Sequence, residues 1–124
     1  MTDCPFCEVE PARLIEESPL TRTIKDGFPV SRGHLLVTPR RHVSDFFDLT
    51  SEERIAVMEA LSRARQRIDD ADGFNVGFNN GQAAGQTVMH VHVHLIPRYR
   101  GDVPDPRGGV RWVIPRKAAY WSKK

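Results

Sequence analysis

The segment of residues 90–95, with the sequence HVHVHL, constrains the fold more than any other part of the chain. Histidine alternates there with aliphatic residues, and a period of two is the period of a β-strand, whose successive side chains point to opposite faces of a sheet. An extended strand would place the imidazoles of His90, His92 and His94 on one face, about 7 Å apart. Three polar, titratable rings are poor core residues, so we expect this face to carry chemistry.

The rest of the sequence predicts the elements around this strand. Thr50 followed by Glu53 fits a capping box at a helix start, and apolar residues recur at helical spacing from Val57 to Ile68. The expected elements are an irregular lead-in at 1–19, strands at 21–25, 34–38, 74–78 and 88–96 (the last ended by Pro97), a short apolar segment at 46–49, a helix from 50 to about 70 and a late strand at 112–114. They predict an α+β fold: an antiparallel sheet of four to five strands, with one long helix over one face and a short helix.

Length and composition favour a single globular domain. The chain has 124 residues, 40% of them hydrophobic and 27% charged, so we expect one domain over 1–124. No unbroken apolar stretch approaches the roughly 20 residues of a membrane span, and no secretory signal is visible, so we expect a cytoplasmic protein with no membrane partner. Residues 98–124 hold eight Lys or Arg against two Asp, which makes the C-terminal tail at 101–124 basic.

The loop before the histidines indicates which chemistry they serve. A row of imidazoles suits either metal ligation or nucleophilic catalysis beside a site for an anionic substrate. Residues 80–87 are rich in Gly, Ala and Gln and contain no carboxylate. A catalytic metal site often recruits Asp or Glu, whereas a phosphate site prefers amides, hydroxyls and free backbone N–H groups. The loop therefore favours a phosphate.

The motif around the histidines resembles the signature of the histidine triad (HIT) family of nucleotide hydrolases and transferases. Residues 79–81 (NNG) and 85–98 (GQTVMHVHVHLIPR) carry the resemblance, which extends upstream through 24–26 (IKD) and 33–37 (GHLLV). It is closest to the bacterial and dinucleoside polyphosphate hydrolase-like branches. The resemblance implies a HIT-like fold and a homodimer with the long helix and a late strand at the interface.

The resemblance also implies roles for individual residues. His92 would be the nucleophile that attacks the α-phosphorus, and a protonated His94 would attract the substrate phosphate. Asp26 would bind the ribose hydroxyls. The phosphate oxygens would be held by Asn79, Gln86 and Thr87. Asp26-Gly27 and an Asn before Asn-Gly are also ordinary turn sequences, so a purely structural role for Asp26 or Asn79 stays open.

The two cysteines form a C-x-x-C pair, Cys4 and Cys7, which is typical of metal or redox chemistry in a reducing compartment. The resemblance to zinc-bearing branches of the family implies a structural zinc held by Cys4, Cys7, His42 and His90. Zinc ligation would prevent His90 from acting as a general acid or base and leave His92 and His94 for catalysis. A free dithiol is the alternative. His90 would then join His92 and His94 in one expected catalytic row, where it would act by hydrogen bonding.

These observations predict a nucleotide hydrolase. It would cleave at the α-phosphate of a purine nucleotide derivative, either a dinucleoside polyphosphate or a nucleoside phosphoramidate, through a covalent nucleotidyl-histidine. Transferase branches typically carry Gln at the end of the triad, whereas this chain has His94, so hydrolysis is preferred over transfer. The alternatives are a non-catalytic nucleotide- or partner-binding module and a metalloenzyme with all three imidazoles on one metal. Nucleic acid is disfavoured, because only the basic tail points to it.

Overall fold

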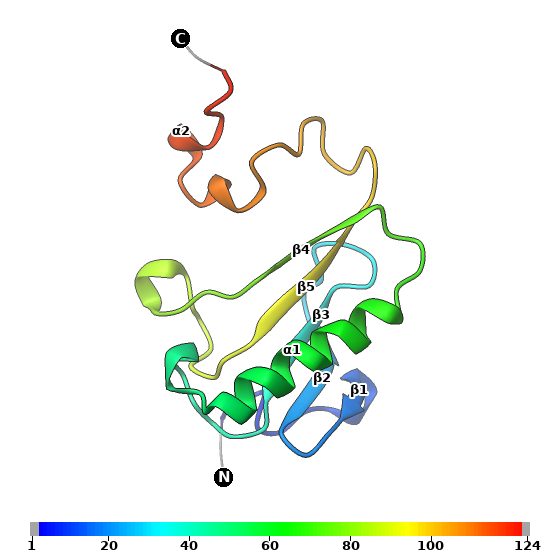
Figure 1. Cartoon of the computed structure of the whole chain (residues 1–124), viewed down its shortest axis with the longest axis vertical. Coiled ribbons are helices and arrows are strands. Elements are labelled where there is room, and N and C mark those ends of the chain that lie inside the picture. The colour runs from blue at the N-terminus through cyan, green and yellow to red at the C-terminus, as the bar shows by residue number, and fades with distance from the viewer. Residues whose placement is uncertain (1–2, 123–124) are drawn as a thin grey trace.

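The computed structural model describes residues 3–122 and has an α+β fold, as predicted (Figure 1). Five strands form one antiparallel sheet in the order β1-β2-β3-β5-β4. The strands are β1 (Leu14–Glu17), β2 (Thr21–Lys25), β3 (Leu35–Pro39), β4 (Gly73–Gly77) and β5 (Val93–Arg98), and the helices are α1 (Ser51–Gln66) and the short α2 (Pro115–Ala118). No helix within 3–122 is long and apolar enough to cross a membrane.

The two faces of the sheet are covered by different parts of the chain. Helix α1 lies across one face (Figure 1), where Val57 packs on Val37 and Val93. On the other face, the N-terminal segment covers β2 and β3, because Cys4 and Phe6 pack with Ile24 and Leu36 in a separate cluster. The site described below lies on this second face.

The capping box at the start of α1 is present as predicted. The Thr50 hydroxyl accepts the Glu53 N–H at 3.0 Å, and the Glu53 carboxylate accepts the Thr50 N–H at 2.9 Å. Arg41 also donates to Glu53 at 2.8 and 2.9 Å, and these hydrogen bonds lower the pKa of Glu53 to about 2. The helix ends at Gln66, before the expected end near residue 70, although Ile68 still packs in the core beneath it. The helical spacing of apolar residues in the sequence therefore continues past the last residue of the helix.

The strand of the histidines is shorter at its start and longer at its end than the sequence predicts. β5 begins at Val93 because the preceding residues bond to a loop, with the Val91 N–H donating to the Val43 carbonyl at 2.7 Å. It runs through Pro97 to Arg98 because β3 pairs with β5 only as far as Leu95. Beyond Leu95, β3 no longer pairs with β5, so the backbone on that side of β5 need not donate a hydrogen bond to a neighbouring strand. Pro97, which has no N–H, is therefore tolerated there.

Two expected elements at the ends of the chain are wrong. The lead-in at 1–19 is not all irregular, because β1 pairs with β2 along one edge of the sheet. Its sequence, LIEE, has no strict alternation and so carries no strand signal. In place of the late strand at 112–114, Trp112 and Val113 belong to a 3-10 helix, Gly109–Val113, and Ile114 caps its C-terminal end. Arg111 donates to the carbonyls of Lys117 and Ala118, which ties this helix to α2 rather than to the sheet.

Candidate functional site

The three histidines share the face opposite α1, as predicted, although only His94 lies in β5. Val93 and Leu95 on the other side of this strand are buried against α1. The His92 ring lies between its neighbours, 5.5 Å from the His94 ring and 4.8 Å from the Phe6 ring. Phe6 also contacts the fully buried His90 ring edge-on. The N-terminal segment thus packs directly against the catalytic row.

The tautomer of His92 follows from one hydrogen bond. Its Nδ1 lies 2.8 Å from the backbone carbonyl oxygen of His90. A carbonyl oxygen can only accept, so Nδ1 carries the proton and donates it. In the neutral ring Nε2 then has no proton and presents a lone pair. This is the state that a nucleophilic imidazole requires.

His34 orients His94 through a second chain of hydrogen bonds. The Val30 N–H donates to His34 Nδ1 at 3.1 Å, so the proton of neutral His34 is on Nε2. His34 Nε2 lies 2.9 Å from His94 Nδ1 and donates to it. The remaining proton of neutral His94 is therefore on Nε2, at the other end of the ring. Sequence reasoning missed this role of His34, which lies directly before β3, the strand that pairs with β5.

The expected cation at His94 is not supported. Burial lowers the pKa of His94, and the nearby His92 and His34 lower it further. Burial also lowers the pKa of His34, although Asp26 opposes this shift. Both rings are therefore neutral near pH 7 in the free protein. His94 therefore presents an oriented Nε2–H donor rather than a positive charge.

Asp26 has the turn role that the sequence left open, and its carboxylate also lies close to His34 and His94. Its Oδ1 accepts the Phe28 N–H at 2.7 Å, which closes the turn after β2. Its Oδ2 lies 3.3 Å from His34 Nε2 and 3.8 Å from His94 Nδ1. The carboxylate thus sits beside the catalytic row, largely buried, with Oδ2 directed to it.

The three residues expected to hold phosphate are placed differently from one another. Asn79 and Thr87 are exposed, on either side of the loop before the histidines. Gln86 is buried and anchors this loop: its Oε1 accepts the Gly81 N–H at 2.7 Å, and its Nε2 donates to the carbonyls of Ser44 and Val88 at 3.0 and 3.1 Å. A direct contact between the Gln86 amide and phosphate would have to replace one of these bonds. The phosphate roles of all three residues stay predictions.

The four residues expected to bind zinc converge. His42 Nδ1 lies 3.2 Å from both Cys7 Sγ and His90 Nδ1, and His90 Nδ1 lies 3.4 Å from Cys4 Sγ. Ligand atoms around a tetrahedral zinc are about 3.3–3.8 Å apart, given its bond lengths to nitrogen and sulfur. His90 Nε2 donates to the Pro39 carbonyl at 2.8 Å, which leaves Nδ1 free to ligate. The donor set and its spacing therefore fit one closed zinc site.

Known proteins share this architecture. A HIT family protein of Bacillus anthracis superposes with a TM-score of 0.72 at 34% identity, over 80% of this chain and 75% of that one. A zinc-bound histidine triad family protein of Mycobacterium smegmatis superposes with a TM-score of 0.69 at 36% identity, over 90% of each chain. An AP-4-A phosphorylase of Mycobacterium tuberculosis is 35% identical over 82% of this chain and 54% of its own length.

The antiparallel sheet with its row of three oriented imidazoles defines the histidine triad class of proteins. The model of the HIT domain matches residues 8–101, which is most of the chain. The chain belongs to the HIT family.

Proposed function

We propose that the protein is a nucleotide hydrolase that cleaves at the α-phosphate of a purine nucleotide derivative through a covalent nucleotidyl-His92 intermediate. The observation that carries this proposal is the hydrogen bond from His92 Nδ1 to the His90 carbonyl. It leaves Nε2 of the neutral ring with a lone pair. The names of relatives support a nucleotide substrate, since they include AP-4-A phosphorylase and adenylylsulfatase.

The reaction would proceed in two displacements at phosphorus. In the first, His92 Nε2 forms a bond to the α-phosphorus, and the bond to the leaving group breaks with its electron pair on the leaving group. A polyphosphate leaves as the anion, whereas the nitrogen of a phosphoramidate takes up a proton from solvent and leaves as the amine. In the second, a water oxygen bonds to the phosphorus, the P–N bond breaks with its electron pair returning to Nε2, and the water proton goes to solvent. The His94 N–H would stabilise the charge that develops on a phosphate oxygen in both steps. Asp26 Oδ2 would accept from a ribose hydroxyl, and Asn79, Gln86 and Thr87 would line the phosphate.

We further propose that Cys4, Cys7, His42 and His90 hold a structural zinc. The metal would crosslink the N-terminal segment to the start of the catalytic row, and it would supply no chemistry to the reaction. The fit of the ligand spacing and the zinc-bound mycobacterial relative support this assignment.

Replacing His34 tests how His94 is oriented. In His34→Leu we expect kcat to fall about 10- to 100-fold, with a smaller change in KM, because His94 loses the donor that sets its tautomer. His34→Gln keeps an N–H that can reach His94 Nδ1, so this variant should recover several-fold of the lost rate. Steady-state hydrolysis of adenosine 5′-phosphoramidate measures both. Equal rates in the two variants would show that His34 only fills space.

We also propose a homodimer, whose interface would cover apolar side chains that are exposed to solvent in the single chain. β4 is an edge strand of the sheet, and Val76 on it is 48% exposed. On α1, Ile55 and Met58 are 59% and 63% exposed. Sedimentation velocity should therefore give twice the chain mass, and Val76→Glu should shift the protein to monomer. A wild-type monomer at micromolar concentration would contradict this proposal. The cytoplasmic location stays a prediction.

A further inference from the structure

The loop at 79–87, between β4 and the histidines, carries the residues proposed to hold phosphate, yet its middle is open to solvent. Residues 81–85 are all exposed, and Gly81 and Gly85 adopt φ values of 92° and 94°. Exposed loops are generally more mobile than the elements they connect. The polar groups of this loop can keep a constant position relative to His92 only if the loop is fixed at its ends.

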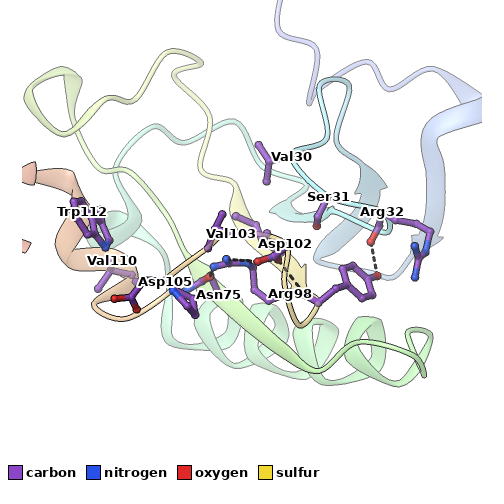
Figure 2. Close-up of a pocket in the computed structure, with 14 residues that line it drawn as sticks. Val30, Ser31, Arg32, Asn75, Arg98, Asp102, Val103, Asp105, Val110 and Trp112 are labelled. Carbon is purple, nitrogen blue, oxygen red and sulfur yellow. Dashed lines mark hydrogen bonds and ion pairs between the residues drawn. The ribbon is translucent and has the colours of Figure 1, made fainter. Parts of the chain in front are cut away.

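The strand that leads into the loop is fixed by the sheet as far as its last residue. Figure 2 shows Arg98 of β5 directed towards Asn75 of β4, to which it donates at 2.7 Å. The pairing of β4 with β5 ends at Gly77, opposite His94. From residue 78 onward, the course of the chain therefore depends on contacts outside the sheet.

Residues 43–46, the anchor segment, hold the end of the loop that lies next to the histidines. The Val43 carbonyl accepts the Val91 N–H at 2.7 Å, and the Ser44 carbonyl accepts a hydrogen bond from Gln86 Nε2 at 3.0 Å. These bonds place the loop and the anchor segment side by side at one end of the sheet (Figure 1). Val43 is buried in a cluster with Val91, so the anchor segment is part of the core.

Asn80 fixes the other end of the loop to the next two residues of the anchor segment. Its Nδ2 donates to Asp45 Oδ1 at 3.1 Å, and its Oδ1 accepts the Phe46 N–H at 2.8 Å. A carboxylate can only accept and a backbone N–H can only donate, so both bonds require the same orientation of the amide. Asp45 Oδ1 also accepts the Phe47 N–H at 2.9 Å, which holds the carboxylate in place for Asn80. Asn80 is half-buried against the anchor segment, whereas Asn79 is exposed.

We propose that Asn80 and Asp45 form a positioning pair, which sets the position of the loop at 79–87 relative to His92 during the reaction. The proposal rests on the hydrolase function proposed above and adds two residues that act through the loop rather than on the substrate. The pair would keep the proposed phosphate contacts of the loop at a constant distance from the attacking Nε2. Hydrogen-bond donors that are fixed in advance stabilise developing charge without reorganising. Loss of the pair should therefore lower kcat more than it raises KM.

Exchanging the two side chains tests the pair. Asn80→Asp is nearly isosteric and places two carboxylates opposite each other in place of the 3.1 Å hydrogen bond. We expect kcat on adenosine 5′-phosphoramidate to fall roughly 10-fold, with KM within about threefold and Tm within about 5 °C of the wild type. In the double variant Asn80→Asp and Asp45→Asn an amide again faces a carboxylate, so kcat should recover to within about threefold of the wild type.

Gln82→Glu is the matched control for the added charge. Gln82 is exposed in the same loop, and its replacement adds one carboxylate without changing either member of the pair. Its kcat should stay within about twofold of the wild type. A loss as large as that of Asn80→Asp would show that negative charge in the loop slows the reaction, and it would overturn the proposal.

The remaining outcomes also overturn it. An unchanged kcat in Asn80→Asp, or a loss that Asp45→Asn does not reverse, would show that the pair does not position the loop. A loss confined to KM would assign Asn80 to substrate binding, and a loss with a much lower Tm would assign it to stability alone. Each of these results in an active wild type leaves the hydrolase function intact. A wild-type protein that hydrolyses neither adenosine 5′-phosphoramidate nor diadenosine tetraphosphate would overturn the hydrolase function itself and this inference with it.

Discussion

The variant His92→Ala loses hydrolysis, and we expect its kcat/KM to fall at least about 10³-fold. The variant removes the ring nitrogen Nε2, which the hydrogen bond from Nδ1 to the His90 carbonyl leaves unprotonated in the neutral ring. The loss should appear in kcat, because the residues proposed to bind ribose and phosphate remain. Initial rates on adenosine 5′-phosphoramidate measure the effect. Rapid quenching and mass spectrometry should find a nucleotidyl adduct on the wild-type chain and none on the variant.

The control for this experiment is Met89→Ala, in the same segment. Met89 is 39% exposed and borders the catalytic row, so its loss should leave the rate within a few-fold of the wild type. A His92→Ala protein with the wild-type rate would contradict the assignment of the nucleophile. A wild-type protein that binds nucleotides but turns none over would favour the non-catalytic binding module.

Loss of the proposed zinc should have the largest effect on stability. In Cys4→Ser we expect the zinc content to fall well below one per chain and the Tm to drop by roughly 10 °C or more. The metal would tie the N-terminal segment to His42 and His90, and Phe6 in that segment packs against the catalytic row. Metal analysis and thermal unfolding with and without a chelator measure both effects.

A substitution at a neighbouring residue distinguishes the effect of losing the metal from the effect of disturbing the N-terminal segment. Glu8→Gln changes an exposed residue next to the C-x-x-C pair and should leave metal content and Tm unchanged. Identical melting of the wild type with and without a chelator would contradict a structural zinc. Immediate and complete loss of activity on chelation, with the fold intact, would indicate a catalytic metal instead.

Local sequence signals predicted most of the fold. The capping box of Thr50 and Glu53 and the alternation around His94 depend on neighbours in sequence, and both are present in the structure. The strand β1 was missed because it is stabilised by pairing with β2, and nothing in its own sequence alternates. The end of β5 was misplaced because the tolerance for Pro97 depends on which neighbouring strand reaches that far.

The candidate site was predictable to the extent that its residues are close in sequence or match a family motif. The proposed zinc ligands converge as the resemblance implied. The protonation of His94 was not predictable, because it depends on burial and on His34, which lies far away in the sequence, directly before β3. The anchoring role of Gln86 depends likewise on the carbonyl of Ser44, far away in the sequence.

The stereochemical course at phosphorus tests the two-step account most directly. The substrate would be an adenosine phosphorothioate derivative that is chiral at the α-phosphorus, hydrolysed in water enriched in oxygen-18. Attack by His92 inverts the configuration once, and the attack of water on the nucleotidyl-histidine inverts it again. The account therefore predicts a product with net retention. Net inversion would show that water attacks the substrate in a single step, and it would contradict the covalent intermediate.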